Sequence, residues 1–289
     1  EQLILLTFTD TTEIIKKRKS DNKRLEAVIS YRTTALEESY KILREKNIFL
    51  EKMNRELETF TFISSHDLQE PLRKIKLFTS CLLDEENAKL SSTGKGYLKK
   101  VQHTVGRMQM LIDDLLIYAG VKEGKHNFEK TDLNKVIKEV IGEFKESIKE
   151  KKAIITANGT CHTKVIVFQF RQVIQNLISN ALKFSHPKRF PRITIKCAIT
   201  PGRLLHYNDL MPEVNYCHIC VVDNGIGFEP EYRDRIFEVF QRLHGQSQYN
   251  GTGIGLAICK RIVENHKGIV IATGKPNKGS QFDIYIPTL

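Results

Sequence analysis

The apolar positions in the first part of the chain follow a helical repeat. The stretch from Glu13 to Asp84 contains no glycine and a single proline. Within it, apolar residues recur every seven positions, at Ile29, Leu36, Leu43, Leu50 and Leu57. A seven-residue repeat is typical of helices that pair in a coiled coil. We therefore expect a long helix that pairs as a parallel dimer, with packing on its own protein as the alternative.

A second amphipathic stretch follows a polar break from Glu85 to Gly96. Apolar residues between Leu98 and Ala119 keep the three-four spacing of a helix with one apolar face. We expect this helix to fold back on the first, so that two hairpins form a dimeric four-helix bundle. Glycines and charged residues then predict a hinge or linker near Val121 to Asn127.

The rest of the chain mixes short apolar runs with amphipathic stretches, which indicates an α+β domain with helices on one face of a mixed sheet. The predicted helices span about 132–149, 169–184 and 254–266. The predicted strands span about 153–157, 163–167, 192–200 and 214–223, with two more at the end. The predicted domains are residues 1–12, 13–124 and 127–289. The first holds a β-prone run, Leu3 to Phe8, expected to be the last strand of a truncated domain.

Composition places few limits on function. The 289 residues are 40% hydrophobic and 27% charged, which is ordinary for a globular protein. The net charge of +11 comes from basic residues interleaved with acidic ones, which favours a solvated surface over nucleic-acid binding. No apolar run approaches the roughly 18 residues of a membrane span. The chain does not begin with Met, so we expect a piece of a longer cytoplasmic protein, with any membrane anchor lying upstream.

The six cysteines are scattered, and we expect them to be reduced. Cys217 and Cys220 lie close together in a predicted strand. Side chains three positions apart on a strand point to opposite faces, so this pair is a poor metal clamp.

The first candidate site is a histidine beside a carboxylate, His66 and Asp67, on the long helix. An apolar stripe runs through Leu68, Leu72 and Ile75, and His66 lies about 180° around the helix from Ile75. We therefore expect His66 to face solvent. A neutral imidazole is a good nucleophile near neutral pH, and an adjacent carboxylate can hold its tautomer or accept its proton.

The second candidate site lies on the helix predicted at 169–184. Asn176, Asn180 and Lys183 occur at i, i+4 and i+7, next to the apolar face. Amide oxygens are hard ligands that suit a hydrated Mg²⁺, and an ammonium suits a polyphosphate. Polar residues on an amphipathic helix are also common without any ligand.

Two glycine-rich segments complete the set. Asp223 ends an apolar strand and is followed by Gly225 and Gly227. A carboxylate at a strand end can accept a hydrogen bond from the exocyclic amine of adenine, although a plain turn is the simpler explanation. Gly251, Gly253 and Gly255 open the next predicted helix, whose free N–H groups favour phosphate.

Taken in order, these segments resemble the H, N, G1 and G2 boxes of sensor histidine kinases. Phe237 to Phe240 resembles the F box, and Gly279 to Phe282 resembles the closing glycine turn. The match covers about residues 55–289. The sequence around His66 resembles the phytochrome-like branch, and Phe8 to Glu13 looks like the exit of a PAS sensor domain. The family resemblance implies an ATP-binding α/β sandwich of the Bergerat type behind the helical hairpin.

The resemblance also implies a role for each candidate residue. His66 would accept the phosphoryl group, with Asp67 as its orienting base and Arg242 as a contact to the γ-phosphate. A segment from about Glu229 to Asn250 would form a lid over ATP. The implied nucleotide ligands, with the two asparagines also positioning Mg²⁺, are Asn176, Asn180, Lys183, Phe184, Asp223, Gly225, Gly227, Gly251, Gly253 and Gly255.

The implied activity is ATP-dependent autophosphorylation of His66, followed by phosphotransfer to an aspartate of a response regulator. The implied partners are a second copy of the chain, the receiver domain and an upstream sensor. Many family members carry Thr or Asn four residues after the histidine, where this chain has Glu70, so phosphatase activity is in doubt. Two alternatives remain: a related ATPase clamp, and a kinase-like dimeric scaffold without phosphotransfer.

Overall fold

The structure is a computed structural model that describes residues 2–85, 90–120, 127–205, 207, 210–243 and 251–288. Within the first helix, the side chains of residues 2–14, 54, 55, 57, 58, 60 and 62 are outside the description. Contacts divide the chain into two units, Glu1–Phe60 and Thr61–Leu289, and each is described by itself.

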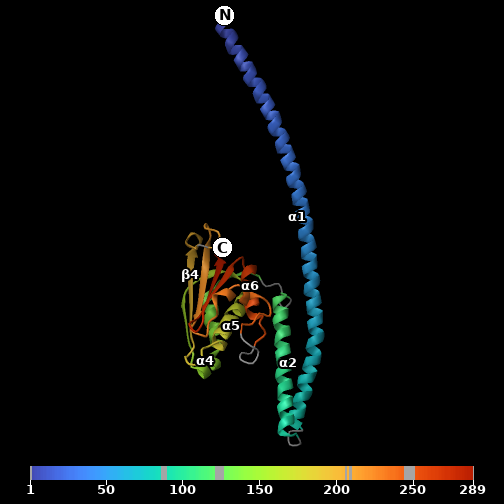
Figure 1. Cartoon of the computed structure of the whole chain (residues 1–289), viewed down its shortest axis with the longest axis vertical. Coiled ribbons are helices and arrows are strands. Elements are labelled where there is room, and N and C mark those ends of the chain that lie inside the picture. The colour runs from blue at the N-terminus through green and yellow to red at the C-terminus, as the bar shows by residue number, and fades with distance from the viewer. Residues whose placement is uncertain are drawn as a thin grey trace. The chain divides into compact units, whose positions relative to one another are not determined.

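Helix α1, Gln2–Glu85, runs through the first unit and into the second (Figure 1). The predicted long helix is thus confirmed, and the predicted strand at Leu3 to Phe8 is wrong because these residues begin α1. Strand propensity depends on a neighbouring strand to pair with, whereas a helix satisfies its backbone hydrogen bonds locally. The repeating residues Ile29, Leu36, Leu43 and Leu50 are exposed in the single chain. Leu57, the fifth, lies outside the described side chains.

In the second unit, the end of α1 packs against α2, Ser92–Tyr118, as the predicted hairpin. The side chain of Ser91 caps α2 by accepting a hydrogen bond from the backbone N–H of Gly94 at 3.1 Å. A small buried cluster joins the helices: Leu72, Val105, Ile112 and Leu116. No helix among the described residues is both long and apolar enough to cross a membrane.

The remainder of the second unit is built on a five-stranded sheet in the order β2-β4-β5-β7-β6. Its strands are β2 (Ile154–Gly159), β4 (Arg192–Pro201), β5 (Asn215–Asp223), β6 (Ile269–Lys275) and β7 (Gly279–Pro287). The β2–β4 pair is parallel and the other pairs are antiparallel, so the predicted mixed sheet is confirmed. A separate antiparallel pair joins β1 (Glu129–Asp132) to β3 (His162–Val165), and β1 was not predicted.

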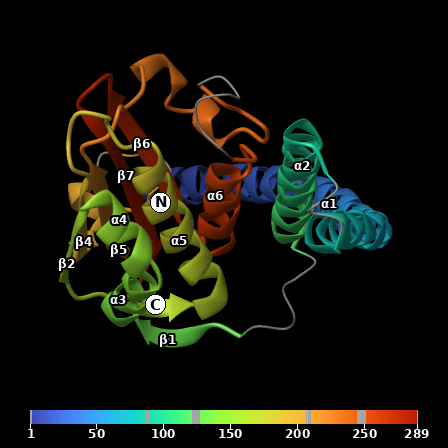
Figure 2. The ribbon, with the colours of Figure 1, turned by 90° about the horizontal axis from the view of Figure 1, so that it is seen from below.

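Helices cover one face of this sheet (Figure 2). They are α3 (Leu133–Glu143), α4 (Lys145–Lys151), α5 (Val167–Lys183) and α6 (Gly255–Asn265). The main core lies between α3, α5, α6 and the inward side chains of the strands. The helix predicted at 132–149 is two helices, because the backbone leaves helical geometry at Phe144 (φ −93°, ψ 12°). At its other end, the Asp132 side chain caps α3.

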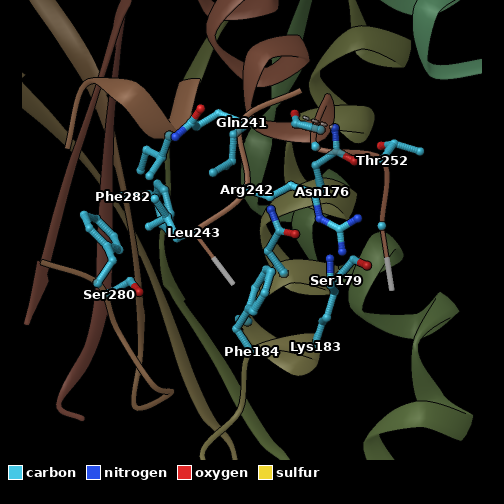
Figure 3. A pocket seen from close by; sticks show the side chains of 18 of the residues that line it. Asn176, Ser179, Lys183, Phe184, Gln241, Arg242, Leu243, Thr252, Ser280 and Phe282 are labelled. Atoms are coloured by element: carbon cyan, nitrogen blue, oxygen red, sulfur yellow. Dashed lines mark hydrogen bonds between the residues drawn. The ribbon is translucent and has the colours of Figure 1, made fainter. Parts of the chain in front are cut away.

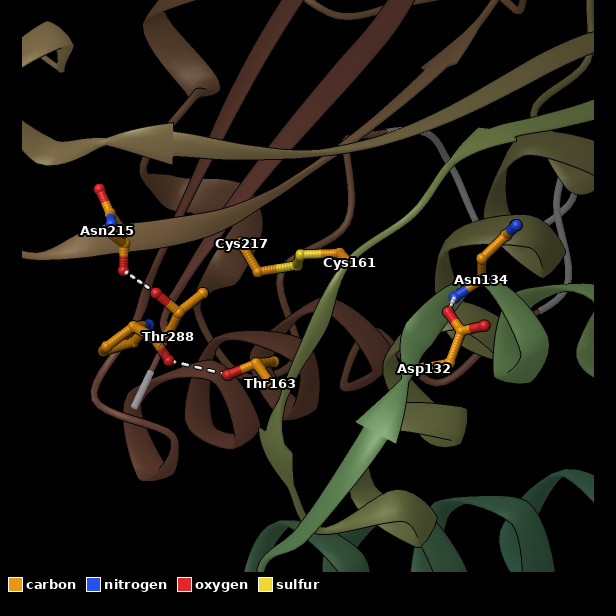
Figure 4. Close-up of a disulfide and its surroundings, with 8 residues drawn as sticks. Asp132, Asn134, Cys161, Thr163, Asn215, Cys217 and Thr288 are labelled. Carbon is orange, nitrogen blue, oxygen red and sulfur yellow. Dashed lines mark hydrogen bonds between the residues drawn. A yellow bond between two sulfur atoms is a disulfide. The ribbon is translucent and has the colours of Figure 1, made fainter.

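Cys161 and Cys217 form a disulfide, which corrects the expectation that all cysteines are reduced (Figure 4). Their Cα atoms are 5.9 Å apart although 56 positions separate them in sequence, so local spacing could not reveal the pair. Both are buried in the main core. Cys220 is a free thiol. Since Cys220 pairs in register with Asp283 and Cys217 with Ile286, the predicted opposite faces of Cys217 and Cys220 are confirmed.

Candidate active site

A pocket of about 410 Å³ lies between α5, the end of β5, the start of β7 and the residues leading into α6 (Figure 3). The structure brings nearly all the predicted ligand residues into its lining: Asn176, Asn180, Lys183, Phe184, Asp223, Gly227, Arg242, Gly251, Gly253 and Gly255. Gly225 is not part of the lining and instead supports Asp223 from behind. Four sequence segments, remote from one another along the chain, thus form one cavity.

Helix α5 supplies one wall of the pocket because its opposite face is anchored in the core. Leu177 and Ile178 are fully buried, so the helix cannot rotate without exposing them. This fixes Asn176, Asn180 and Lys183 on the pocket side. The Asn176 side-chain amide donates to the carbonyl of Gly255 at 3.1 Å and ties α5 to the first turn of α6. The helix therefore holds its amide and ammonium groups at fixed spacing.

One end of the pocket is positively charged. Lys183 is half-buried, and burial lowers its pKa, with a further lowering from the positive charge of Arg242. The Lys183 ammonium lies 4.4 Å from the ring centroid of Phe184. Figure 3 shows the side chains of Lys183 and Arg242 pointing into the same space. Two cations near one another favour an anionic ligand between them.

A partly buried carboxylate, that of Asp223, also lines the pocket. Oδ1 of Asp223 accepts hydrogen bonds from the backbone N–H groups of Gly225 at 2.7 Å and Ser280 at 3.3 Å. Burial raises the pKa of Asp223, and these hydrogen bonds oppose the rise. A carboxylate has about four acceptor positions, so it can still accept a hydrogen bond from a ligand donor.

Glycine at two positions allows the backbone to close around this carboxylate. A Cβ on Gly225 would lie 2.5 Å from the Phe184 carbonyl oxygen. Gly279 has a φ of +113°, and a Cβ there would overlap the carbonyl oxygen of Asp223. The turn after β5 and the start of β7 therefore approach more closely than any side chain would permit.

His66 and Asp67 lie on α1 and are not part of the pocket lining. The His66 side chain is 70% exposed, which confirms the orientation predicted from the helical phase. Its Nδ1 lies 3.4 Å from Oδ1 of Asp67. One turn further, Glu70 pairs with Lys74 at 2.8 Å, and this contact is the main reason that the pKa of Glu70 is lowered.

Several residues in and around the pocket were not predicted from the sequence. Ser280 supports Asp223, and Arg189 donates to the carbonyls of Gly225 (3.2 Å) and Asn277 (2.7 Å), which braces the turn after β5. From α2, Met110 and Asp114 reach the lining, and Asp114 accepts a hydrogen bond from the hydroxyl of Thr252 at 2.5 Å. In the sequence, Gly279 could have pointed to the neighbouring Ser280 as a site residue, whereas no local pattern distinguishes Asp114 from other polar residues of its helix. Of the predicted lid, residues 244–250 lie outside the described residues.

Two family models match the chain. Residues 56–124 match the His Kinase A (phospho-acceptor) domain. Residues 167–289 match the histidine kinase-, DNA gyrase B-, and HSP90-like ATPase domain. The first match contains His66, and the second contains α5, Asp223 and the glycines at 251, 253 and 255. The first match covers the helical hairpin, and the second covers the α/β domain from α5 onward.

Curated relatives include the phytochrome-like protein Cph1 of Synechocystis sp., which is 36% identical over 238 residues, covering 82% of this chain and 30% of the relative. Cyanobacterial phytochrome A of Nostoc sp. is 35% identical over 238 residues, covering 82% and 29%. The chain thus spans less than a third of the length of these relatives. They agree with the phytochrome-like resemblance of the motifs, while the relation to a PAS domain stays a prediction.

Solved structures share the fold. Full-length ShkA in complex with AMPPNP aligns with a TM-score of 0.60 and 22% identity, covering 78% of this chain and 45% of that one. Histidine kinase ThkA in complex with the response regulator protein TrrA aligns with a TM-score of 0.54 and 20% identity, covering 83% and 65%. At this identity the likeness concerns architecture, which is a helical hairpin followed by an α/β domain.

Proposed function

We infer that this chain, which belongs to the histidine kinase family, transfers the γ-phosphoryl group of ATP to His66 and then to an aspartate of a response regulator. One observation carries the proposal: a single cavity is lined by a partly buried carboxylate and two cations, and the same chain exposes a histidine beside a carboxylate. The cavity suits a nucleotide, and the histidine suits a phosphoryl acceptor.

The pocket accounts for both ends of ATP. The carboxylate of Asp223 accepts a hydrogen bond from the adenine amine. The phosphates lie toward Lys183 and Arg242, whose charges attract them. The backbone N–H groups in the first turn of α6, which have no carbonyl partner within the helix, add further donors and the positive end of the helix dipole. The volume of about 410 Å³ lies in the range of ordinary ligand sites.

The donor set also fits Mg²⁺. Asn176 and Asn180 offer amide oxygens on one face of α5, and the hydrogen bond from the Asn176 amide nitrogen to Gly255 leaves its oxygen as the atom free to act as a ligand. Mg²⁺ prefers such oxygen ligands and retains several waters. When bound with ATP, the ion would neutralise phosphate charge, and Asn176 and Asn180 would hold it there.

The acceptor chemistry follows from the geometry at His66. With Nδ1 protonated toward Asp67, the Nε2 lone pair is the nucleophile. Nε2 forms a bond to the γ-phosphorus, the bond from that phosphorus to its bridging oxygen breaks, and ADP leaves. Asp67 stabilises the positive charge that develops on the ring and can take the Nδ1 proton. Arg242 offsets the negative charge that moves onto the leaving oxygen.

A homodimer is part of the proposal. On α1, the apolar side chains of Leu68, Ile75 and Leu82 are about half exposed in the single chain, although they share a stripe with buried Leu72. The heptad residues further upstream are exposed as well. A second copy packed along this stripe would bury both sets as a four-helix bundle and a coiled coil. We propose that the dimer works in the cytoplasm, where ATP and receiver domains meet it.

The test is incubation of the chain with γ-labelled ATP and Mg²⁺, followed by acid and base treatment. Phosphohistidine is acid-labile and base-stable, so we expect label that acid removes and base does not. The variant His66→Gln should lose the label while it still binds nucleotide. His103→Gln, another exposed histidine of the hairpin, is the matched control and should label normally. Acid-labile label that persists in His66→Gln would refute the assignment.

The same assay separates the alternatives. A related ATPase clamp would release phosphate without labelling the chain, and a scaffold would do neither. Phosphotransfer is tested by adding a receiver domain to labelled chain and following the label to that domain. Mixing His66→Gln with Asp223→Asn chains tests transfer between subunits, because restored labelling requires one chain to act on the other.

A further inference from the structure

The outer face of the sheet, opposite the helices, carries a compact group of three metal-ligating side chains. His218 and Cys220 are two positions apart on β5, so they share a face. Asp283 on β7 is the register partner of Cys220. The ligand atoms of these three side chains all lie within 4.8 Å of one another. Because both strands are central in the sheet, their backbones hold this spacing.

The surroundings orient the group. Nε2 of His218 lies 2.8 Å from Oδ1 of Asp283, and the Gln281 amide donates to Oδ2 of Asp283 at 2.7 Å. The His218 ring stacks on Tyr285, with centroids 4.4 Å apart and an interplanar angle of 16°. The carboxylate and the imidazole are therefore fixed by neighbours that leave Oδ1, Nε2 and the sulfur facing one another.

We propose that His218, Cys220 and Asp283 bind one Zn²⁺ ion on the outer face of the sheet. An imidazole nitrogen, a thiolate and a carboxylate are the ligands that zinc uses in proteins, and three of them with a water complete a tetrahedron. Ligand atoms in such a site lie roughly 3.5 Å apart. In the metal-free group Nε2 of His218 and Oδ1 of Asp283 are closer than this, at 2.8 Å, and all the ligand atoms lie within 4.8 Å, so binding requires side-chain rotation. A thiolate with an imidazole also selects zinc over Mg²⁺ and Ca²⁺.

Metal binding must displace a proton from this group, and the ion must reach it from solvent. Burial raises the pKa of Asp283, but hydrogen bonds from His218, Gln281 and Cys220 outweigh it and hold the pKa below its usual value. Burial and the nearby Asp283 raise the pKa of Cys220 to about 12. The metal-free thiol is thus protonated, and coordination forms a zinc–sulfur bond and releases that proton to solvent. The His218 side chain is 26% exposed, which leaves a path for the ion.

The direct test titrates the untagged chain with Zn²⁺ and, separately, with Co²⁺ as a coloured substitute. We expect one equivalent to bind, with sulfur-to-cobalt charge-transfer absorption and visible bands typical of tetrahedral cobalt. Cys220→Ser should abolish the charge-transfer band and weaken zinc affinity at least tenfold, whereas Cys81→Ser, another free cysteine, should change neither. Circular dichroism and nucleotide binding establish that each variant is folded.

A second measurement needs no variant. Zn²⁺ should slow alkylation of Cys220 at least tenfold, read by mass spectrometry, and leave alkylation of Cys81 within twofold. Absent charge transfer, unchanged zinc affinity in Cys220→Ser, or equal alkylation of Cys220 with and without zinc would each overturn the proposal. The site is independent of nucleotide chemistry, so failure here leaves the proposed kinase activity intact.

Discussion

The hydrogen bonds at Asp223 make base recognition testable by a single substitution. In Asp223→Asn, the side-chain carbonyl can keep the Oδ1 position and accept from Gly225 and Ser280. The amide nitrogen then replaces the second carboxylate oxygen and presents N–H groups to the amine of adenine. Because burial raises the pKa of Asp223, a neutral side chain of equal size removes a buried charge and should leave the fold intact.

The expected loss follows from what the carboxylate contributes. A hydrogen bond to a charged group contributes about 1.5–3 kcal/mol, which corresponds to a roughly 10- to 150-fold change in affinity. In the variant, the N–H groups of Asn face the N–H groups of the adenine amine, and this mismatch adds to the loss of ATP affinity. Guanine carries a carbonyl oxygen where adenine carries its amine, so the amide of the variant can donate to GTP. Asp223→Asn should therefore weaken ATP binding by that factor and reduce the preference for ATP over GTP by at least as much.

The assay is calorimetry with non-hydrolysable ATP and GTP analogues in the presence of Mg²⁺. Asp234→Asn is the control, because Asp234 is a well-exposed carboxylate of the same domain and should change either affinity by less than twofold. If Asp223→Asn keeps both the ATP affinity and the ratio of ATP to GTP affinity, the carboxylate does not read the base and the orientation proposed for the nucleotide is wrong.

Three further predictions concern stability. Gly279→Ala should lower the unfolding free energy, measured by denaturant titration, by about 3 kcal/mol or more. The control Gly255→Ala should lower it by less than about 1 kcal/mol, because its Cβ would lie 3.5 Å from the nearest atom. Equal losses would contradict the close approach of the backbone at Gly279. Burial lowers the pKa of His266, so its contribution to stability is complete above the pKa that it has in the unfolded chain and is lost as pH falls below that value. Tm should therefore drop from pH 7 to pH 5, and less so in His266→Gln. Parallel plots of Tm against pH for the two proteins would contradict this. Reduction of the Cys161–Cys217 disulfide should cost about 4 kcal/mol by loop entropy and lower Tm by roughly 10 °C; a Tm unchanged by reductant would show that the bond is absent in solution.

Local patterns predicted the elements that carry the chemistry. The helical phase placed His66 in solvent, and the spacing on α5 placed its two asparagines and Lys183 on one face. Both are properties of a single helix, so sequence spacing is sufficient. The strand ending at Asp223 was likewise visible as an apolar run followed by glycines. These positions were predictable because each depends on its immediate neighbours.

Three of the misses, strand β1, the disulfide and Asp114, depend on partners that are distant in sequence. Strand β1 has no apolar alternation and exists because it pairs with β3 about thirty residues later. Cys161 bonds to Cys217 on β5 although 56 positions separate them in sequence. Asp114 lies on α2 and hydrogen-bonds to Thr252 at the pocket. The apolar spacing of α2 predicts a hairpin helix but not this contact. Pairings of this kind come from tertiary contacts that no window of the sequence contains.

The alternation of side chains along strand β5 directs them to three separate environments. Cys217 faces the core disulfide, Cys220 faces the outer group, and Asp223 turns inward again to the pocket. Inserting one residue before Cys217 would shift the strand by one position and send every one of these side chains to the wrong face. In evolution, this segment should therefore accept exchanges of residues far more readily than changes of length.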